Sequence, residues 1–558
     1  MKKNGIGRYG MTVLQLTPDM NVREAISSFL FANEGSHDVC IRFAPGDYVF
    51  DHPQAVKDWQ DVLFGRTDYD TLWGRTGKPY NKEMVFRGMK RVTVEGYGAT
   101  LWMQGLTAPI TLDSCEQVNL RGFSINWAEP HFTLVRIDRT ENEWLRLSAE
   151  NGFSLAGGEV VWGLYDWDAM THEVCHVYKF RNMSPLLKQE DGTFLLNVGK
   201  TAQRLSAGMR LILRHVGNYR PVIHLLRSAD VRIEDVTVYT GPGMGVIAHY
   251  SRDIIFRRFK VMPWKNRVMS TTTDSTHFIS CSGLIDFEDC YFEGAGDDAV
   301  NVHGFYLRVD EIIDAHTLRA GILRHDGTQD QVCDAPQTGE TVAFYHSAEQ
   351  SEFVQARVAQ ASVDEDTWDI ILRFEEPVCS QLTAGDMLTQ CSDVAALRFH
   401  RCHVRSQRAR GVLSQTRNVL IEGCLFELLS GTAVHVYSDL VEAWYESISA
   451  DHVTIRDNRM RRCGYADGTY QNTSGVAIES GETDNSVGVH RRLTIECNRI
   501  TGCGNTGIAV MNADDVVVQG NTIEGCSVGI DVCASDHVQL MHNSMGDAPV
   551  RYQLVHEN

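Results

Sequence analysis

The sequence predicts an all-β protein: a right-handed parallel β-helix, or solenoid, interrupted by two inserted small antiparallel β-barrel or sandwich domains. Similar apolar segments recur every 22 or 23 residues. In a solenoid, one coil of that length returns the chain to the same position about one strand spacing, roughly 4.8 Å, further along. Two long stretches lack this period and contain short alternating runs joined by turns, which is typical of antiparallel insertions.

Residues 1–132 are expected to form an N-terminal cap and the first coils. Apolar residues at i, i+3 and i+4 spacing predict a helix over Asn21–Asn33, which we expect to cover the first coil. A turn at Pro45–Gly46 separates two predicted strands. Asp51–Met84 has no clear period, and we expect a long loop there.

The two inserted domains are predicted at residues 133–217 and 305–392. The first contains runs such as TLVRI, WLRLSA and GTFLLNV, and the second contains LRVDEI, TVAFYH and WDIILRF. Residues 218–304 between them return to the coil pattern and carry the candidate catalytic groups. Residues 393–558 are predicted to form the C-terminal coils.

The C-terminal coils repeat most clearly, as in NVLIEGCLF, RLTIECNRI and DVVVQGNTI. Asn498, Asn521 and Asn543 recur at 23 and 22 residues, so we expect an asparagine ladder that bonds from coil to coil. Cysteines at the same intervals, such as Cys402 and Cys424, are expected to stack as reduced core thiols.

Composition limits the partners. The 558 residues include 72 Asp and Glu against 52 Lys and Arg, a formal charge of −20. This charge argues against nucleic acid or an anionic membrane as a partner and suits a neutral substrate. The N-terminal stretch has no apolar run of signal-peptide length, so a cytoplasmic protein is expected, or a secreted or periplasmic one if a signal was removed. For the oligomeric state, the sequence leaves a homodimer open.

Cofactors are not indicated by the sequence. The 15 cysteines show no CxxC pair and no zinc-type spacing, so we expect neither a metal site nor a cofactor.

The stretch from Met269 to Gly304 concentrates acids, histidines and glycines. Asp274 precedes Asp297 by 23 residues, one coil, so it should lie beside Asp297 and Asp298. Glycines just before the pair would allow a corner of unusual φ from which both acids face outward. Three neighbouring carboxylates repel one another and tend to hold one proton, a cost that a catalytic site explains better than a solvated turn does.

Several other side chains could contact a sugar. Asn301 and His303 share a strand face after the acids, and His277 lies close to them, although His303 could also be a buried core histidine. Arg408 and Arg410 could donate to hydroxyls or orient carboxylates, or form surface ion pairs. Trp444, with Glu446 nearby, could be a sugar platform or only anchor a loop.

A resemblance carries the interpretation further. The run TTDSTHFISCSGLIDFEDCYFEGAGDDAVNVHG, with RARGVL and WYES, resembles the exo-acting α-1,3-galactosidases of glycoside hydrolase family 110. More distantly, it is similar to the polygalacturonases of family 28, which share an Asp one coil before an Asp-Asp pair. The resemblance implies hydrolysis of a galactose-terminated oligosaccharide with inversion. Asp297 would then be the general acid, and Asp274 and Asp298 would hold and deprotonate the attacking water.

Two alternatives stay open at this point. The chain could be another β-helix glycosidase that acts on an anionic polysaccharide, which its negative charge disfavours. It could also be a non-catalytic carbohydrate-binding β-helix protein, because a fold alone does not fix function.

Overall fold

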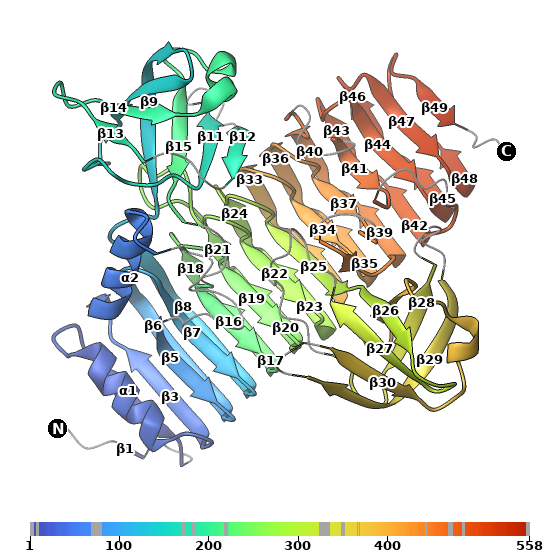
Figure 1. The fold of residues 1–558 in the computed structure, drawn as a ribbon, viewed down its shortest axis with the longest axis horizontal. Helices are drawn as coiled ribbons and strands as arrows, with labels where there is room; N and C mark the ends of the chain where they lie inside the picture. The colour runs from blue at the N-terminus through green and yellow to red at the C-terminus, as the bar shows by residue number, and fades with distance from the viewer. Residues whose placement is uncertain are drawn as a thin grey trace.

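The computed structural model describes residues 5–6, 10–67, 81–168, 174–180, 185–216, 221–322, 335–346, 352–364, 367, 369–440, 444–466, 473–481 and 486–553. These residues form one long parallel β-helix with two inserted antiparallel β domains (Figure 1). The predicted fold class is therefore confirmed. The expected boundary at residue 217 or 218 lies outside the described residues.

One wall of the solenoid is a 13-stranded sheet in which twelve strands come from successive coils. Its strands are parallel except for β38, which pairs antiparallel with β25. They are β5 (Asn81–Arg87), β7 (Thr107–Asp113), β16 (Ile223–Leu226), β19 (Val246–His249), β22 (Thr276–Ile279), β25 (Val300–Phe305), β34 (Val412–Ser414), β37 (Val434–Val436), β38 (Glu446–Ser447), β41 (Ser474–Ile478), β44 (Thr506–Met511), β47 (Val528–Cys533) and β49 (Val550–Gln553).

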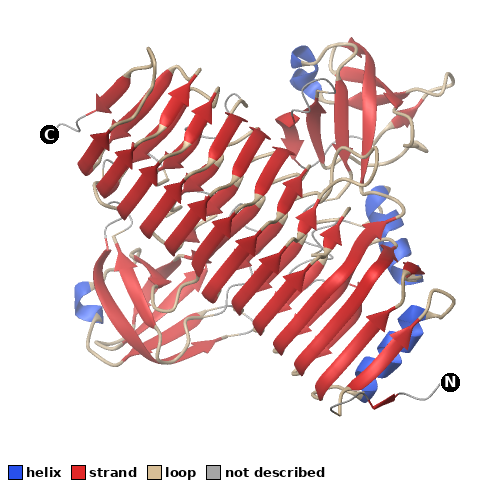
Figure 2. Ribbon diagram, turned by 180° about the vertical axis from the view of Figure 1, so that it is seen from behind, coloured by secondary structure: helices blue, strands red, loops and turns tan. Residues whose placement is uncertain are grey.

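The second wall is a 23-stranded sheet that most coils cross with two short consecutive strands. Figure 2 shows these rows from behind. The strands are β1 (Gly5–Ile6), β2 (Thr12–Leu16), β3 (His37–Phe43), β4 (Gly46–Val49), β6 (Lys90–Met103), β8 (Glu116–Trp127), β17 (Ala229–Glu234), β18 (Thr237–Val238), β20 (Arg252–Arg257), β21 (Lys260–Val261), β23 (Ser282–Glu288), β24 (Tyr291–Glu293), β32 (Ala396–His400), β33 (His403–Gln407), β35 (Arg417–Glu422), β36 (Leu425–Leu429), β39 (Asp451–Arg456), β40 (Arg459–Cys463), β42 (His490–Glu496), β43 (Arg499–Thr501), β45 (Ala513–Gln519), β46 (Thr522–Glu524) and β48 (Asp536–Met541).

The core between the two walls is built from side chains that stack at the same place in successive coils. The Phe256 and Phe287 rings are parallel with their centroids 4.4 Å apart, Phe399 continues this row, and Phe426 of the neighbouring row packs against Phe399. All four are fully buried. Alternate residues of each strand point inward, so period-2 sequence patterns repeated once per coil are enough to build this core.

The predicted asparagine ladder is confirmed and begins one coil earlier than expected, at Asn458. Each side-chain amide donates to the next side-chain carbonyl, at 3.0 Å for Asn458 to Asn498, 3.0 Å for Asn498 to Asn521 and 2.9 Å for Asn521 to Asn543. The predicted cysteine stack also forms, since the Cys402 amide donates to the sulfur of Cys424, and both thiols are free.

Among its described residues, the N-terminal end has two helices, of which the sequence predicted one. α1 (Val22–Ala32) agrees with that prediction and is capped by the side chain of Asn21. α2 (Pro53–Leu63) lies within Asp51–Met84, where we expected a long loop, so that expectation was wrong for these residues, while residues 68–80 lie outside the described part of the chain. Its buried residues, Ala55, Trp59 and Val62, follow helical spacing, but three apolar positions are too few to stand out in the sequence.

The first inserted domain is a seven-stranded antiparallel sheet with its own apolar core. Its elements are β9 (Phe132–Glu141), β10 (Trp144–Ala149), β11 (Gly163–Trp167), β12 (Val174–Phe180), β13 (Leu187–Lys188), β14 (Phe194–Asn197), the 3-10 helix η2 (Gly199–Arg204) and β15 (Arg210–Arg214).

The second inserted domain is a closed six-stranded antiparallel barrel. Its elements are β26 (Leu307–Ile312), β27 (Thr317–Ile322), β28 (Thr341–Tyr345), β29 (Glu352–Val363), β30 (Ile370–Phe374), the 3-10 helix η3 (Cys379–Gln381) and β31 (Met387–Gln390).

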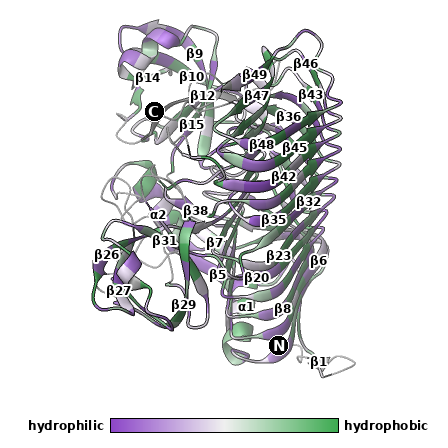
Figure 3. Ribbon diagram, turned by 90° about the vertical axis from the view of Figure 1, so that its right-hand side faces the viewer, coloured by the Kyte–Doolittle hydropathy of each residue, from purple (hydrophilic) through white to green (hydrophobic). Residues whose placement is uncertain are grey.

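Both inserted domains project from one side of the solenoid (Figure 3). Met269 packs in an apolar cluster with the first domain, and Ile279 packs against the core of the barrel. The segment between Met269 and Ile279, which contains Asp274, is therefore held from both sides. No described helix is long and apolar enough to cross a membrane.

Candidate active site

The three candidate aspartates lie in the turns that lead into β22 and β25, two neighbouring strands of the 13-stranded wall. Thr276 of β22 pairs with Val300 of β25, and the amide of Ser275 donates to the backbone carbonyl of Asp298 at 2.8 Å. Asp274 is thus brought beside the Asp297–Asp298 pair, as the coil spacing predicted. The local register is 24 residues rather than 23, which makes Asp298 its direct neighbour in the adjacent coil.

Two glycines shape the turn before the acidic pair, but only one in the way expected. Gly294 has φ +71°, the left-handed conformation that favours glycine. Gly296 does not have a positive φ. A Cβ atom there would lie 2.3 Å from the carbonyl oxygen of Thr272, so the turns pack too closely for any other residue.

Asp297 and Asp298 are each held by an arginine from the coil that follows the barrel. Arg408 Nη1 lies 2.7 Å from Asp297 Oδ2. The backbone N–H and Nη1 of Arg410 donate to the two carboxylate oxygens of Asp298 at 2.8 and 2.9 Å. Burial raises the pKa of Asp298, and Arg410 opposes that shift.

The three carboxyl groups differ in exposure. The side chain of Asp297 is 30% exposed, whereas those of Asp274 and Asp298 are 7% and 4% exposed. Burial raises the pKa of Asp274 well above its usual value, and the charges of Asp297, Asp298 and Glu446 raise it further. The carboxyl group of Asp297 is therefore open to a ligand, and the buried carboxyl group of Asp274 favours its protonated form.

Asp274 continues into a row of two histidines. His277 Nδ1 lies 2.5 Å from Asp274 Oδ2, and His277 Nε2 lies 2.7 Å from His303 Nε2. His303 Nδ1 donates to the carbonyl oxygen of Gly304 at 2.7 Å. Burial lowers the pKa of both imidazoles, and the neighbouring His277 lowers that of His303 further.

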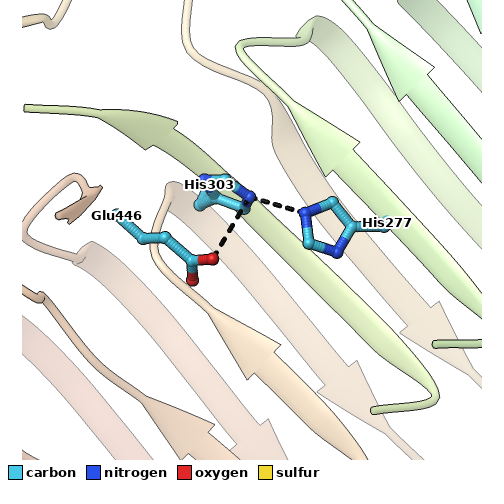
Figure 4. A group of neighbouring side chains, drawn as sticks. All are labelled: His277, His303 and Glu446. Carbon is cyan, nitrogen blue, oxygen red and sulfur yellow. Dashed lines mark hydrogen bonds and ion pairs between the residues drawn. The ribbon is translucent and has the colours of Figure 1, made fainter. Parts of the chain in front are cut away.

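Glu446 reaches the same place from β38, as Figure 4 shows. Its Oε1 lies 3.6 Å from His303 Nε2, and burial raises its pKa. Donor atoms of His277, His303 and Glu446 lie within 4.8 Å of one another, so by composition this group could hold a metal ion. The 2.7 Å contact between the two Nε2 atoms instead requires a proton between them, because two bare lone pairs at that distance would repel.

Of the two remaining predicted residues, Asn301 lies within this cluster, and Trp444 lies two residues before Glu446 in the chain. Asn301 pairs with His277 across the two strands, is buried, and lies close enough to Glu446 to oppose the rise in the pKa of that carboxyl group. Trp444 is 44% exposed, and its backbone N–H donates to the carboxylate of Asp439 at 3.0 Å.

Sequence reasoning missed Gln407. This fully buried amide donates to the carbonyls of Asp297 and Arg410 and ties their two turns together. Its position next to RARG was visible, but its partner turn lies 110 residues away. No local pattern identifies such a contact.

Comparison with known proteins agrees with the β-helix fold. A family described as right handed beta helix region matches residues 387–545. An Alpha-1,3-galactosidase B of Phocaeicola vulgatus is 30% identical over 453 residues, covering 75% of this chain and 72% of the relative. An Alpha-1,3-galactosidase B of Bacteroides thetaiotaomicron is 27% identical over 447 residues, covering 75% and 69%.

Among solved structures, an exopolygalacturonase from Thermotoga maritima covers 95% of this chain and 92% of its own, with a TM-score of 0.36 and 11% identity. The family is shown by the Phocaeicola vulgatus relative, through its identity and its coverage. This chain belongs to the family of the bacterial alpha-1,3-galactosidases and is a glycoside hydrolase.

Proposed function

We propose that the chain is an exo-acting, inverting glycosidase that removes terminal α-1,3-linked galactose from oligosaccharides or glycans. The names of its relatives support the substrate. The observation that carries the mechanism is the difference in exposure among three adjoining carboxyl groups, of which only Asp297 is substantially open to solvent.

In this proposal Asp297 is the general acid. An exposed carboxyl group can reach the glycosidic oxygen of a bound substrate and give it a proton as the bond to the aglycone breaks. Asp274 and Asp298 are buried beside it and would hold the attacking water and take its proton. Arg408 forms an ion pair with Asp297, and Arg410 forms one with Asp298. These contacts support a role for both arginines in orienting the two carboxyl groups.

The substrate would lie against residues around the acids. We propose that the exposed indole of Trp444 packs on a sugar face, and that Asn301 and Glu446 bond to galactose hydroxyls. The sequence also suggested His277 and His303 as substrate contacts. Both ring nitrogens of each histidine already have protein partners, which favours a supporting role for them.

The first test follows the anomer released. We expect β-galactose to appear first, because a single displacement by water inverts an α-linkage. Proton NMR of the early product measures this, on galactosides with α-1,3, α-1,4 and α-1,6 linkages. Early α-galactose would instead indicate a covalent intermediate and make one aspartate a nucleophile. No galactose release from the α-1,3 substrate would refute the proposed specificity.

The second test concerns metal ions. We expect full activity after dialysis against EDTA, since the proposed steps are proton transfers between carboxyl groups and a proton fills the His277–His303 contact. The rate on an aryl α-galactoside, before and after chelation, checks this. Complete loss that one divalent ion restores would contradict the assignment.

A further inference from the structure

The Asp274–His277–His303 row ends on a group that can only accept a hydrogen bond. The carbonyl oxygen of Gly304 carries no proton, so the proton in its 2.7 Å contact belongs to His303 Nδ1. In a neutral ring this leaves His303 Nε2 as a bare acceptor. The proton in the 2.7 Å contact between the histidines therefore belongs to His277 Nε2.

With Nε2 protonated, His277 can use Nδ1 in two ways. It can accept a hydrogen bond from a protonated Asp274, or it can carry a second proton and donate it to an ionised Asp274. The Nδ1 to Oδ2 distance of 2.5 Å fits one proton held between the two atoms. Moving that proton from oxygen to nitrogen changes neither the charge of the pair nor its contacts.

We propose that His277 is a positioning residue that takes up this shared proton, so that Asp274 acts as the carboxylate that deprotonates the attacking water. His303, oriented by the Gly304 carbonyl, accepts the other N–H of His277 and so stabilises the imidazolium form. This inference rests on the proposed hydrolytic function and assigns a role within the same site.

The site needs a side chain that can take up a proton, such as His277, because its carboxyl groups outnumber its arginines. Asp274 faces Asp297 and Asp298 from the turn before β25 and Glu446 from β38. Arg408 and Arg410, from the turn before β34, contact Asp297 and Asp298. Burial and the neighbouring carboxylates raise the pKa of Asp274, and a carboxyl group that stays protonated cannot accept a proton from water.

The proton balance closes over the reaction. The new bond forms between the anomeric carbon and the water oxygen, and a water proton passes to Asp274, so that the Asp274–His277 pair then holds two protons. Asp297 loses one proton to the departing oxygen. Exchange with solvent returns the pair to one proton and Asp297 to its acid form before the next turnover.

The test replaces His277 by Gln, which keeps the size and hydrogen-bonding ability of the side chain but cannot become a cation. We expect the acidic limb of kcat/KM on an aryl α-galactoside to move to higher pH by about one to three units, since an adjacent cation lowers a carboxyl pKa by that much. Activity should recover toward the wild-type level above the shifted limb. His303→Gln should give a smaller shift in the same direction.

His435→Gln is the matched control. His435 is also buried, lies on the same wall at β37, and contacts Glu479 at 2.8 Å. We expect its pH profile to keep the wild-type position. A His277→Gln profile that is lowered evenly at all pH values would show a purely structural role and overturn the inference.

A second measurement does not depend on activity or on folding of the His277 variant. Proton NMR of the wild-type protein should show a strongly deshielded imidazole proton from the short Asp274–His277 contact, absent in Asp274→Asn. This signal would persist even if no galactose were released, so the shared proton and the proposed function can fail separately. No such signal, or an equimolar divalent ion bound at His277 and His303, would overturn the inference.

Discussion

Replacing Asp297 by Asn is expected to reduce kcat/KM on an α-1,3-linked digalactoside by about 10²- to 10⁴-fold, the usual contribution of a general acid. The same change should reduce the rate on a nitrophenyl α-galactoside much less. A sugar alkoxide is a poor leaving group and needs a proton, whereas a nitrophenolate departs without one. The ratio of the two losses therefore reports on the acid itself.

Asp274→Asn and Asp298→Asn are the matched controls, because both replace a carboxylate of the same cluster by its neutral isostere. Water activation is needed whatever the leaving group. Each of these substitutions should therefore lower kcat/KM on both substrates by similar factors. Thermal unfolding of all three variants checks their folding. Equal losses on both substrates for Asp297→Asn, with sparing of the aryl substrate by Asp298→Asn, would exchange the two roles.

Repetition explains why so much of the fold was predictable. A solenoid places residues one coil apart beside each other. The 23-residue interval between Asn498 and Asn521 was therefore enough to predict that the two side chains contact each other. The same rule brought Asp274 to Asp298 across a single coil. The shift from 23 to 24 residues arose because the corners take up an extra residue without disturbing the strands, and an average period does not reveal this.

Contacts that skip the repeat were beyond prediction. Arg408 meets Asp297 only because the barrel is inserted as a closed unit and the chain returns to the next coil after it. Glu446 reaches His303 because β38 folds back antiparallel on β25, from a loop with no coil pattern of its own. The sequence showed suitable side chains at these positions. Which carboxyl group meets which arginine or histidine depends on how the folded coils pack.

The asparagine ladder, which helped to predict the fold, should also contribute strongly to stability. Asn498→Ala should lower the free energy of unfolding by about 3 kcal/mol, because several buried polar groups lose a partner and cannot reach water. The Asn498 side chain accepts from the backbone and side-chain amides of Asn458 and donates to the carbonyls of Ile455 and Asn521. Urea unfolding followed by circular dichroism measures the loss.

Asn543→Ala at the end of the ladder provides the comparison. Asn543 is only half-buried, and its side chain bonds to Asn521 and to the carbonyl of Val518. Water can replace part of what this substitution removes, so we expect a loss of about 1 kcal/mol. Neither change touches the aspartates, and kcat/KM per folded molecule should stay at the wild-type level. Equal destabilisation by the two substitutions would mean that burial does not set the strength of the ladder, and that each asparagine acts mainly through the local conformation of its corner.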